Sequence, residues 1–306
     1  MKHFTQFTLI ICFLATAMTP SVAQLPKTQI YVFDMARDGA GIAFSKAKLM
    51  TAFNPVGYNN QPQWINNNEL YAAIQFPNDT NQTDIWSLSL INNVITRVTA
   101  TPESEYSPTL APDRRFISCV RVDARQSTTQ RLWTYPIDRS NSGKDVLPLL
   151  NNIGYHCWLT DKKVALFIVD GATNHLKLAN IDDQSSVQLN GGIGRSLARM
   201  NNGKLAYVQK ATPQTWYIKD LDPLNYGNSN ILIETLPGSE DFALLGDGTF
   251  LMGYAAKLYA YNPSDPVKEW REVADLSKYG LTNIKRLAVS RESDKIAIVN
   301  DISNVK

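Results

Sequence analysis

Residues 112–117 read Pro112-Asp113-Arg114-Arg115-Phe116-Ile117, a polar turn followed at once by an apolar strand. A turn of Asn, Asp or Gly before an apolar strand recurs roughly every fifty residues, a period typical of repeat folds. The other copies of this turn begin at Asn67, Asp161, Asn202, Asp247 and Ser293. Six copies predict six structural units of the same kind.

A further strand follows most of these turns, and it usually carries an aromatic residue. The aromatic column is Tyr31, Trp86, Trp133, Tyr217 and Tyr259, with Lys177 as the exception. The strands alternate, as strands packed between neighbouring sheets do, so we interpret the column as packing between units. A β-sandwich pair or an α/β domain is the alternative, but a parallel sheet needs long helical crossovers. Only residues 267–276 are compatible with a helix, and it would be short.

The sixth unit has only its first two strands, and the second of these ends at Val299. The missing half lies at the other end of the sequence, where Ile30 to Phe33 matches the aromatic third strand. Residues 41–44 or 48–50 supply the fourth strand. We therefore expect residues 30–33 to pair with residues 296–299. The predicted fold class is an all-β, six-bladed β-propeller of four-stranded antiparallel blades, closed by N-terminal strands pairing with C-terminal strands, since closure removes exposed sheet edges.

The first 23 residues have the pattern of a secretory signal: Lys2, an apolar stretch, and a small-residue cleavage site at Ala23. We expect residues 1–23 to be removed and residues 24–306 to form a single propeller domain, periplasmic or secreted. No later stretch approaches the length of a transmembrane segment. Cys119 and Cys157 are interpreted as small buried hydrophobic residues, with one disulfide between them as the alternative.

Composition excludes some classes of partner. The chain has 30 Lys and Arg against 28 Asp and Glu, and these charges are scattered. No basic face for a nucleic acid is indicated, because such binding requires clustered cations.

The segment Ser107-Pro108-Thr109-Leu110-Ala111-Pro112-Asp113-Arg114 resembles the turn of TolB-like propeller repeats, also called PD40 or WD40-like repeats. Residues 83–88 and 92–99 are similar to the later part of the same repeat. The resemblance is close over about residues 54–150 and implies a fold more than a chemistry. It concerns the propeller alone, because TolB has a separate α/β domain before its propeller. Peptidases of this type add a hydrolase domain, but no G-x-S-x-G sequence occurs here.

Catalytic signatures are weak. Only His156 and His175 follow the signal, so a histidine-rich metal site is not expected, and no cofactor is predicted. The cluster Gly191-Gly192-Ile193-Gly194 precedes a strand, whereas a phosphate loop precedes a helix, so we interpret it as a connection between blades.

The loops that lead into the innermost strands of a propeller converge at one mouth of its channel, and they are the default binding surface. The predicted ligand-binding residues there are Asn60, Glu105, Tyr106, Tyr155, His156, Arg195, Asp241 and Lys285. Asn59, Gln61, Ser196, Glu240 and Asn283 adjoin them.

We expect a non-enzymatic binding or scaffolding propeller that recognises an envelope or extracellular protein, peptide or glycan at this mouth, with no nucleic-acid partner. The alternative is a propeller lyase or hydrolase acting on a sugar or peptide, because paired carboxylates permit acid–base chemistry.

Overall fold

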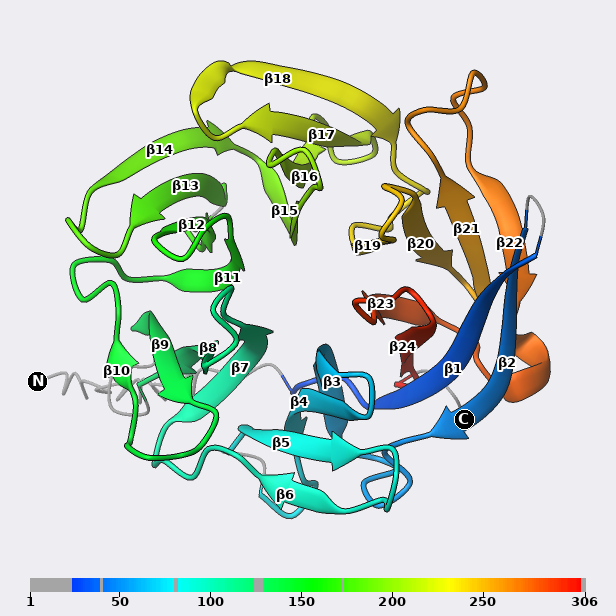
Figure 1. Ribbon diagram of the computed structural model, residues 1–306, viewed down its shortest axis with the longest axis horizontal. Helices are drawn as coiled ribbons and strands as arrows, with labels where there is room; N and C mark the ends of the chain where they lie inside the picture. Colours follow the sequence, from blue (N-terminus) through cyan, green and yellow to red (C-terminus); the bar gives the residue numbers. More distant parts are fainter. Residues whose placement is uncertain (1–23, 39–40, 80–81, 124–128, 172, 304–306) are drawn as a thin grey trace, which may run out of the picture.

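The computed structural model describes residues 24–38, 41–79, 82–123, 129–171 and 173–303. These residues form six four-stranded antiparallel sheets, arranged as the blades of a ring (Figure 1). The predicted six-bladed β-propeller is therefore confirmed. The predicted signal peptide, residues 1–23, lies outside the described residues.

Five blades are each built from four consecutive strands, and each is named here by its innermost strand. From the centre outward, the β3 blade contains β3 (Tyr58–Asn66), β4 (Glu69–Gln75), β5 (Asp84–Ser89) and β6 (Ile95–Arg97), and the β7 blade contains β7 (Ser104–Leu110), β8 (Phe116–Val122), β9 (Gln130–Pro136) and β10 (Lys144–Asp145). The β11 blade contains β11 (Ile153–Trp158), β12 (Lys163–Ile168), β13 (His175–Asn180) and β14 (Ser186–Gly191), and the β15 blade contains β15 (Ile193–Arg199), β16 (Leu205–Lys210), β17 (Trp216–Asp222) and β18 (Asn225–Glu234). The β19 blade contains β19 (Phe242–Leu244), β20 (Phe250–Tyr254), β21 (Lys257–Tyr261) and β22 (Arg271–Asp275).

The sixth, or closing, blade combines both ends of the chain. Its order from the centre outward is β23 (Ile284–Val289), β24 (Lys295–Asp301), β1 (Thr28–Asp38) and β2 (Gly41–Leu49). Ile30 lies opposite Val299 and Phe33 lies opposite Ile296, so the predicted pairing of residues 30–33 with residues 296–299 is confirmed. Strand β2 contains the first segment proposed for the fourth strand, residues 41–44, and Lys48 and Leu49 of the second.

The core lies between neighbouring blades. Ile30 and Val299 of the closing blade are fully buried against Leu70 of the β3 blade. Burying a side chain of this size contributes about 1.5–3 kcal/mol relative to leaving it exposed. Trp86 and Trp133 of the aromatic column also pack against such clusters, which confirms that these aromatic residues pack between blades.

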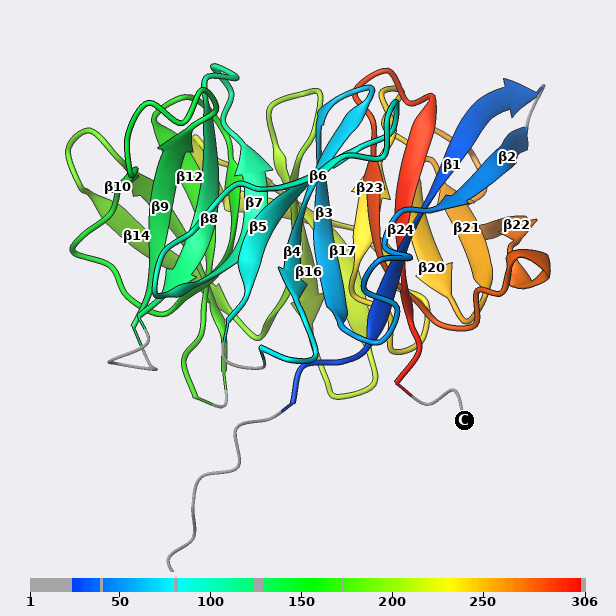
Figure 2. The ribbon, with the colours of Figure 1, turned by 90° about the horizontal axis from the view of Figure 1, so that it is seen from below.

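The innermost strands all run the same way, and this gives the ring two distinct faces. Strand β1 starts and strand β24 ends at one face, the lower one in Figure 2. The innermost strands begin at this face, and we call its opening the near mouth. They end at the opposite face, the far mouth, where turns lead into the second strands.

The helix considered for residues 267–276 is wrong, because Arg271–Asp275 form strand β22 on the edge of the β19 blade. A single 3₁₀ turn, η1 (Ser277–Tyr279), follows and ends at Gly280, whose φ is 83°. Pairing with β21 outweighs the weak local preference for a helix, as tertiary context commonly does.

Cys119 and Cys157 are both buried and free, as interpreted from the sequence. In the part of the chain that the structure describes, no helix is long and apolar enough to cross a membrane.

Candidate functional site

The innermost strands are irregular where they leave the near mouth. Pairing registers shift between Asn60 and Gln63 in β3, and between Ile284 and Arg286 in β23. Similar shifts occur in β7, β11 and β15. A β-bulge bends its strand and redirects a side chain, and the shift in β23 lets the consecutive residues Lys285 and Arg286 both reach the near mouth.

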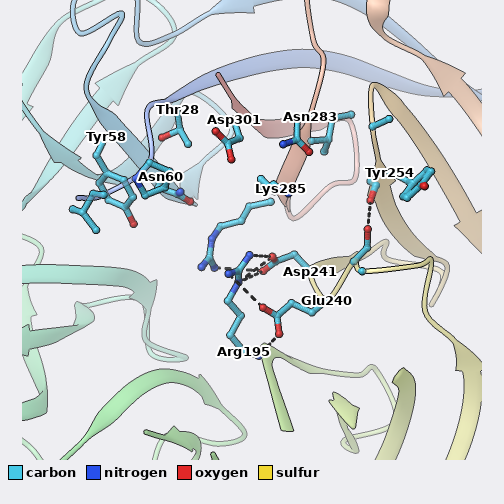
Figure 3. A pocket seen from close by; sticks show the side chains of 18 of the residues that line it. Thr28, Tyr58, Asn60, Arg195, Glu240, Asp241, Tyr254, Asn283, Lys285 and Asp301 are labelled. Atoms are coloured by element: carbon cyan, nitrogen blue, oxygen red, sulfur yellow. Dashed lines mark hydrogen bonds and ion pairs between the residues drawn. The ribbon is translucent and has the colours of Figure 1, made fainter. Parts of the chain in front are cut away.

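A pocket of about 470 Å³ occupies the near mouth. Five of the eight predicted ligand-binding residues line it, and Figure 3 shows four of them by label: Asn60, Arg195, Asp241 and Lys285, with Tyr155 as the fifth. They come from five different blades, so the structure gathers residues that are far apart in sequence.

An ion-pair network connects the β15 and β19 blades on one side of this pocket. The Arg195 guanidinium donates through Nε to Asp241 Oδ2 at 3.0 Å and also contacts Glu240 Oε1 at 3.3 Å. Lys210 Nζ lies 2.8 Å from Glu240 Oε2. Both carboxylates therefore have cationic partners.

A second arginine extends the network across the channel. Arg286 of the closing blade donates from Nη2 to the Tyr155 hydroxyl at 2.9 Å, and its Nη1 lies 3.5 Å from Asp241 Oδ1. Tyr155, Arg195, Asp241 and Arg286 line both the near-mouth pocket and a smaller cavity of about 170 Å³ deeper in the channel. These four residues, which we call the channel network, form the floor of the near-mouth pocket.

The electrostatics of the channel network favour fixed charges. Burial by itself lowers the pKa of Arg195, but Asp241 and Glu240 outweigh this effect and raise it. The pKa of Arg286 is likewise lowered by burial and raised more strongly by Asp241 and Tyr155. Burial raises the pKa of the Tyr58 phenol. Both arginines stay charged and Tyr58 stays neutral near neutral pH, so these three groups suit recognition better than proton transfer.

His156 lies below the floor, among the residues around the deeper cavity. Its Nε2 is 2.6 Å from Ser118 Oγ, which also accepts a hydrogen bond from Trp158 Nε1 at 2.8 Å. Burial lowers the pKa of His156 to about 3, so the ring is neutral at physiological pH. The structure thus places His156 in the channel without placing it in the near-mouth pocket.

Glu105 and Tyr106 do not line the near-mouth pocket. Glu105 is fully buried, and its Oε1 accepts hydrogen bonds from Thr101 and, at 3.5 Å, from Tyr135. Burial raises the pKa of Glu105 to about 7. The Tyr106 hydroxyl accepts a hydrogen bond from Thr83 at 3.2 Å, so both side chains lie between blades.

Several residues of the near-mouth pocket are absent from the set predicted from the sequence, among them Arg286, Tyr58 and Asp301. Period-2 alternation places Arg286 on the opposite side of β23 from Lys285, and only the bulge brings both to the pocket. Asn59, which adjoined the predicted set, is fully buried. Its Nδ2 donates to the carbonyl of Thr28 at 2.6 Å, so it fixes β3 against the closing blade.

Among the described residues, no group of three or more His, Cys, Asp or Glu side chains could hold a metal ion.

No family model and no curated protein matches the sequence. Solved structures match in fold. A protein described as TolB from Agrobacterium tumefaciens superposes with a TM-score of 0.66 at 10% identity, over 90% of this chain and 98% of that chain. TolB from Acinetobacter baumannii has a TM-score of 0.54 at 13% identity, over 91% of this chain and 64% of that chain.

The chain has a TolB-like propeller fold. An oligogalacturonate lyase from Vibrio parahaemolyticus has a TM-score of 0.51 at 10% identity, over 90% of this chain and 98% of that chain. Because the same architecture occurs in a lyase, the TolB-like fold assigns no activity by itself.

Proposed function

We propose that this chain is an exported, non-enzymatic binding propeller that recognises a polar segment of a protein or peptide at the near mouth. The observation that carries the proposal is the pocket of about 470 Å³ above the channel network. Ligand sites are commonly concave, with volumes of about 300–1,000 Å³ and a few convergent polar groups. Export is inferred from the sequence of residues 1–23.

The pocket offers groups of both signs to a ligand. Lys285 is exposed at its rim, and among the described residues no carboxylate lies within ion-pair distance of its ammonium. Asp301 and the Asn283 amide lie on the same side (Figure 3). A peptide segment carries charges of both signs together with N–H and C=O groups, so it complements this mixed lining.

The floor supports binding because it is already ordered. Arg195 and Arg286 are held by Asp241 and Tyr155 before any ligand arrives. A ligand that docks on fixed side chains loses less free energy to ordering them than one that must immobilise free rotamers.

The lyase or hydrolase alternative requires a carboxylate acid and base, and the pocket lining holds Asp301 and the adjacent pair Glu240 and Asp241. Arg195 contacts both members of this pair, and Lys210 and Arg286 add one contact each. Neither carboxylate of the pair is free of a cation, an arrangement that supports a structural and binding role over acid–base chemistry.

A peptide library displayed on phage and selected on the purified chain tests the proposal. Selected peptides are expected to bind the Lys285→Glu variant about tenfold more weakly and the Lys278→Glu variant unchanged, because Lys278 is an equally exposed lysine outside the pocket. Peptides that bind both variants equally would place recognition elsewhere. Turnover of polysaccharides or peptides that is lost in Asp241→Asn would instead support the enzyme.

A further inference from the structure

The far mouth carries two hollows that the proposed function does not use. One, of about 550 Å³, lies at the ends of β3, β7 and β23 and has Trp64, Leu110 and Pro112 among its lining. The other, of about 440 Å³, lies at the ends of β15, β19 and β23 and includes Met200 and Leu244. Val289 and Arg291 line both hollows, so the two meet at the start of the β23–β24 turn.

Exposed arginines without carboxylate partners gather around these hollows. Most described arginines lie in ion pairs, for example Arg121 with Glu103 and Arg195 with Asp241. The exceptions among the described residues are Arg114, Arg139, Arg199 and Arg291. Three of these four line the two hollows, namely Arg114, Arg199 and Arg291, and all three are exposed.

The two mouths therefore differ in charge. The near-mouth pocket balances Arg195, Lys285 and Arg286 with Glu240, Asp241 and Asp301. The far hollows have only Glu292 and Asp247 as acidic lining residues, and Asp247 is already paired with Arg37. The lining of the far hollows thus carries an excess of positive charge, with Arg114, Arg199 and Arg291 against Glu292 and Asp247.

Hydrogen bonds between blades hold the second hollow in shape. Asn201 of the β15–β16 turn donates from Nδ2 to the carbonyl of Gly246 at 2.7 Å. The Gly246 amide in turn donates to Ser293 Oγ of the closing blade at 2.9 Å. Three adjacent blades are tied together at this point, so the hollow exists before a partner binds.

We infer that the far mouth is a second binding surface, and that it takes an acidic extended peptide segment of a partner protein. Carboxylates of the segment would pair with Arg291 and its neighbours, since arginine binds carboxylates with two parallel hydrogen bonds. Apolar side chains on either side of the acidic residues would enter the two hollows. The chain would then hold one partner at each mouth. This inference stands independently of the near-mouth proposal.

Two adjoining hollows that contain apolar as well as polar lining residues favour a peptide over an anionic membrane or a polyanion. A lipid surface or a sulfated polysaccharide would use the arginines alone and leave apolar lining residues such as Leu110 and Leu244 without a partner. Binding of a lipid surface and binding of a sulfated polysaccharide are the competing outcomes of the test.

The test measures binding of a labelled synthetic peptide, in which two leucines flank a run of glutamates, by fluorescence anisotropy. We expect Arg291→Glu to weaken binding about tenfold and Lys278→Glu to leave it unchanged. A peptide with alanines in place of the leucines should also bind more weakly, and a peptide with lysines in place of the glutamates should not bind.

Three results would overturn the inference. The first is no binding of the glutamate peptide to the unaltered chain. The second is equal binding by Arg291→Glu. The third is stronger Arg291-dependent binding of heparin or phosphatidylglycerol vesicles than of the peptide. Loss of near-mouth peptide binding in Lys285→Glu would leave these results unaffected, so the two proposals fail separately.

Discussion

Arg286 donates a hydrogen bond to the hydroxyl of Tyr155 across the channel, at 2.9 Å. The two residues are 131 positions apart and belong to the closing blade and the β11 blade, which are three blades apart in a ring of six. This contact joins opposite sides of the ring and completes the floor of the near-mouth pocket. It therefore couples the stability of the ring to the shape of the pocket.

Removing the Tyr155 hydroxyl should destabilise the fold. Tyr155→Phe leaves the Arg286 guanidinium with its 3.5 Å contact to Asp241 and without its shorter partner. We expect a loss of about 1.5–3 kcal/mol in the free energy of unfolding, the range for a hydrogen bond to a charged group. Urea denaturation measures it, and Tyr226→Phe, at an exposed tyrosine, is the control. Equal stability of the two variants would mean that the contact contributes nothing.

Glu105 should make stability depend on pH. Its pKa is about 7 in the folded chain because of burial, against an ordinary value of 4.5. Below about pH 4.5 the Glu105 carboxyl is protonated in both the folded and the unfolded chain, so its raised pKa does not lower the free energy of unfolding there. Between about pH 4.5 and about pH 7 the unfolded chain releases this proton while the folded chain still holds it. The free energy of unfolding therefore falls by up to about 3 kcal/mol over this interval.

Glu105→Gln should remove this dependence. At about pH 8 the variant should be more stable than the unaltered chain, and at about pH 5 the difference should be small. Denaturation at a series of pH values measures the effect, with Glu292→Gln at an exposed position as the control. If the difference between Glu105→Gln and the unaltered chain is the same at both pH values, the carboxyl does not titrate in this range.

His156 should not titrate in the folded chain at mildly acidic pH. Burial lowers its pKa to about 3, and Ser118 holds Nε2 at 2.6 Å. Its imidazole proton resonances should therefore stay constant from about pH 8 to about pH 5, and should shift with a midpoint of about 6.5 once urea unfolds the chain. A midpoint of about 6.5 in the folded chain would contradict the buried position.

Weakening the contact between β1 and β24 in the closing blade should lower the free energy of unfolding. Phe33 is fully buried, lies opposite Ile296 and packs edge-on against Tyr279 at 5.1 Å between ring centroids. Phe33→Ala should lower the free energy of unfolding by about 3–5 kcal/mol. The control Ile91→Ala, at a side chain that is 75% exposed, should change it by about 0.5 kcal/mol or less. Similar values for the two variants would be inconsistent with a closed ring.

The architecture could be predicted because it depends on spacing and alternation. The recurring turns gave the number of blades, and the incomplete sixth unit showed which segments must pair. The pairing of residues 30–33 with residues 296–299 follows from that count, and the structure adds the register, with Ile30 opposite Val299. Alternation and turn residues are local properties, so one sequence is enough to read them.

The site was less predictable, because bulges in the innermost strands decide which side chains face the channel. Lys285 and Arg286 both reach the near-mouth pocket, although regular alternation would send them to opposite faces. Glu105 is buried between blades instead. Bulge positions depend on packing against neighbouring blades, and that packing is absent from local sequence patterns.

Hydrogen exchange of the chain with and without a selected near-mouth peptide tests whether the near mouth is the binding site. We expect slower amide exchange in residues 253–255 and 283–286, which line the near-mouth pocket, and unchanged exchange in residues 289–293 at the far mouth. Protection at the far mouth or on the outer strands, with none in residues 283–286, would contradict the assignment of the near mouth as the binding site.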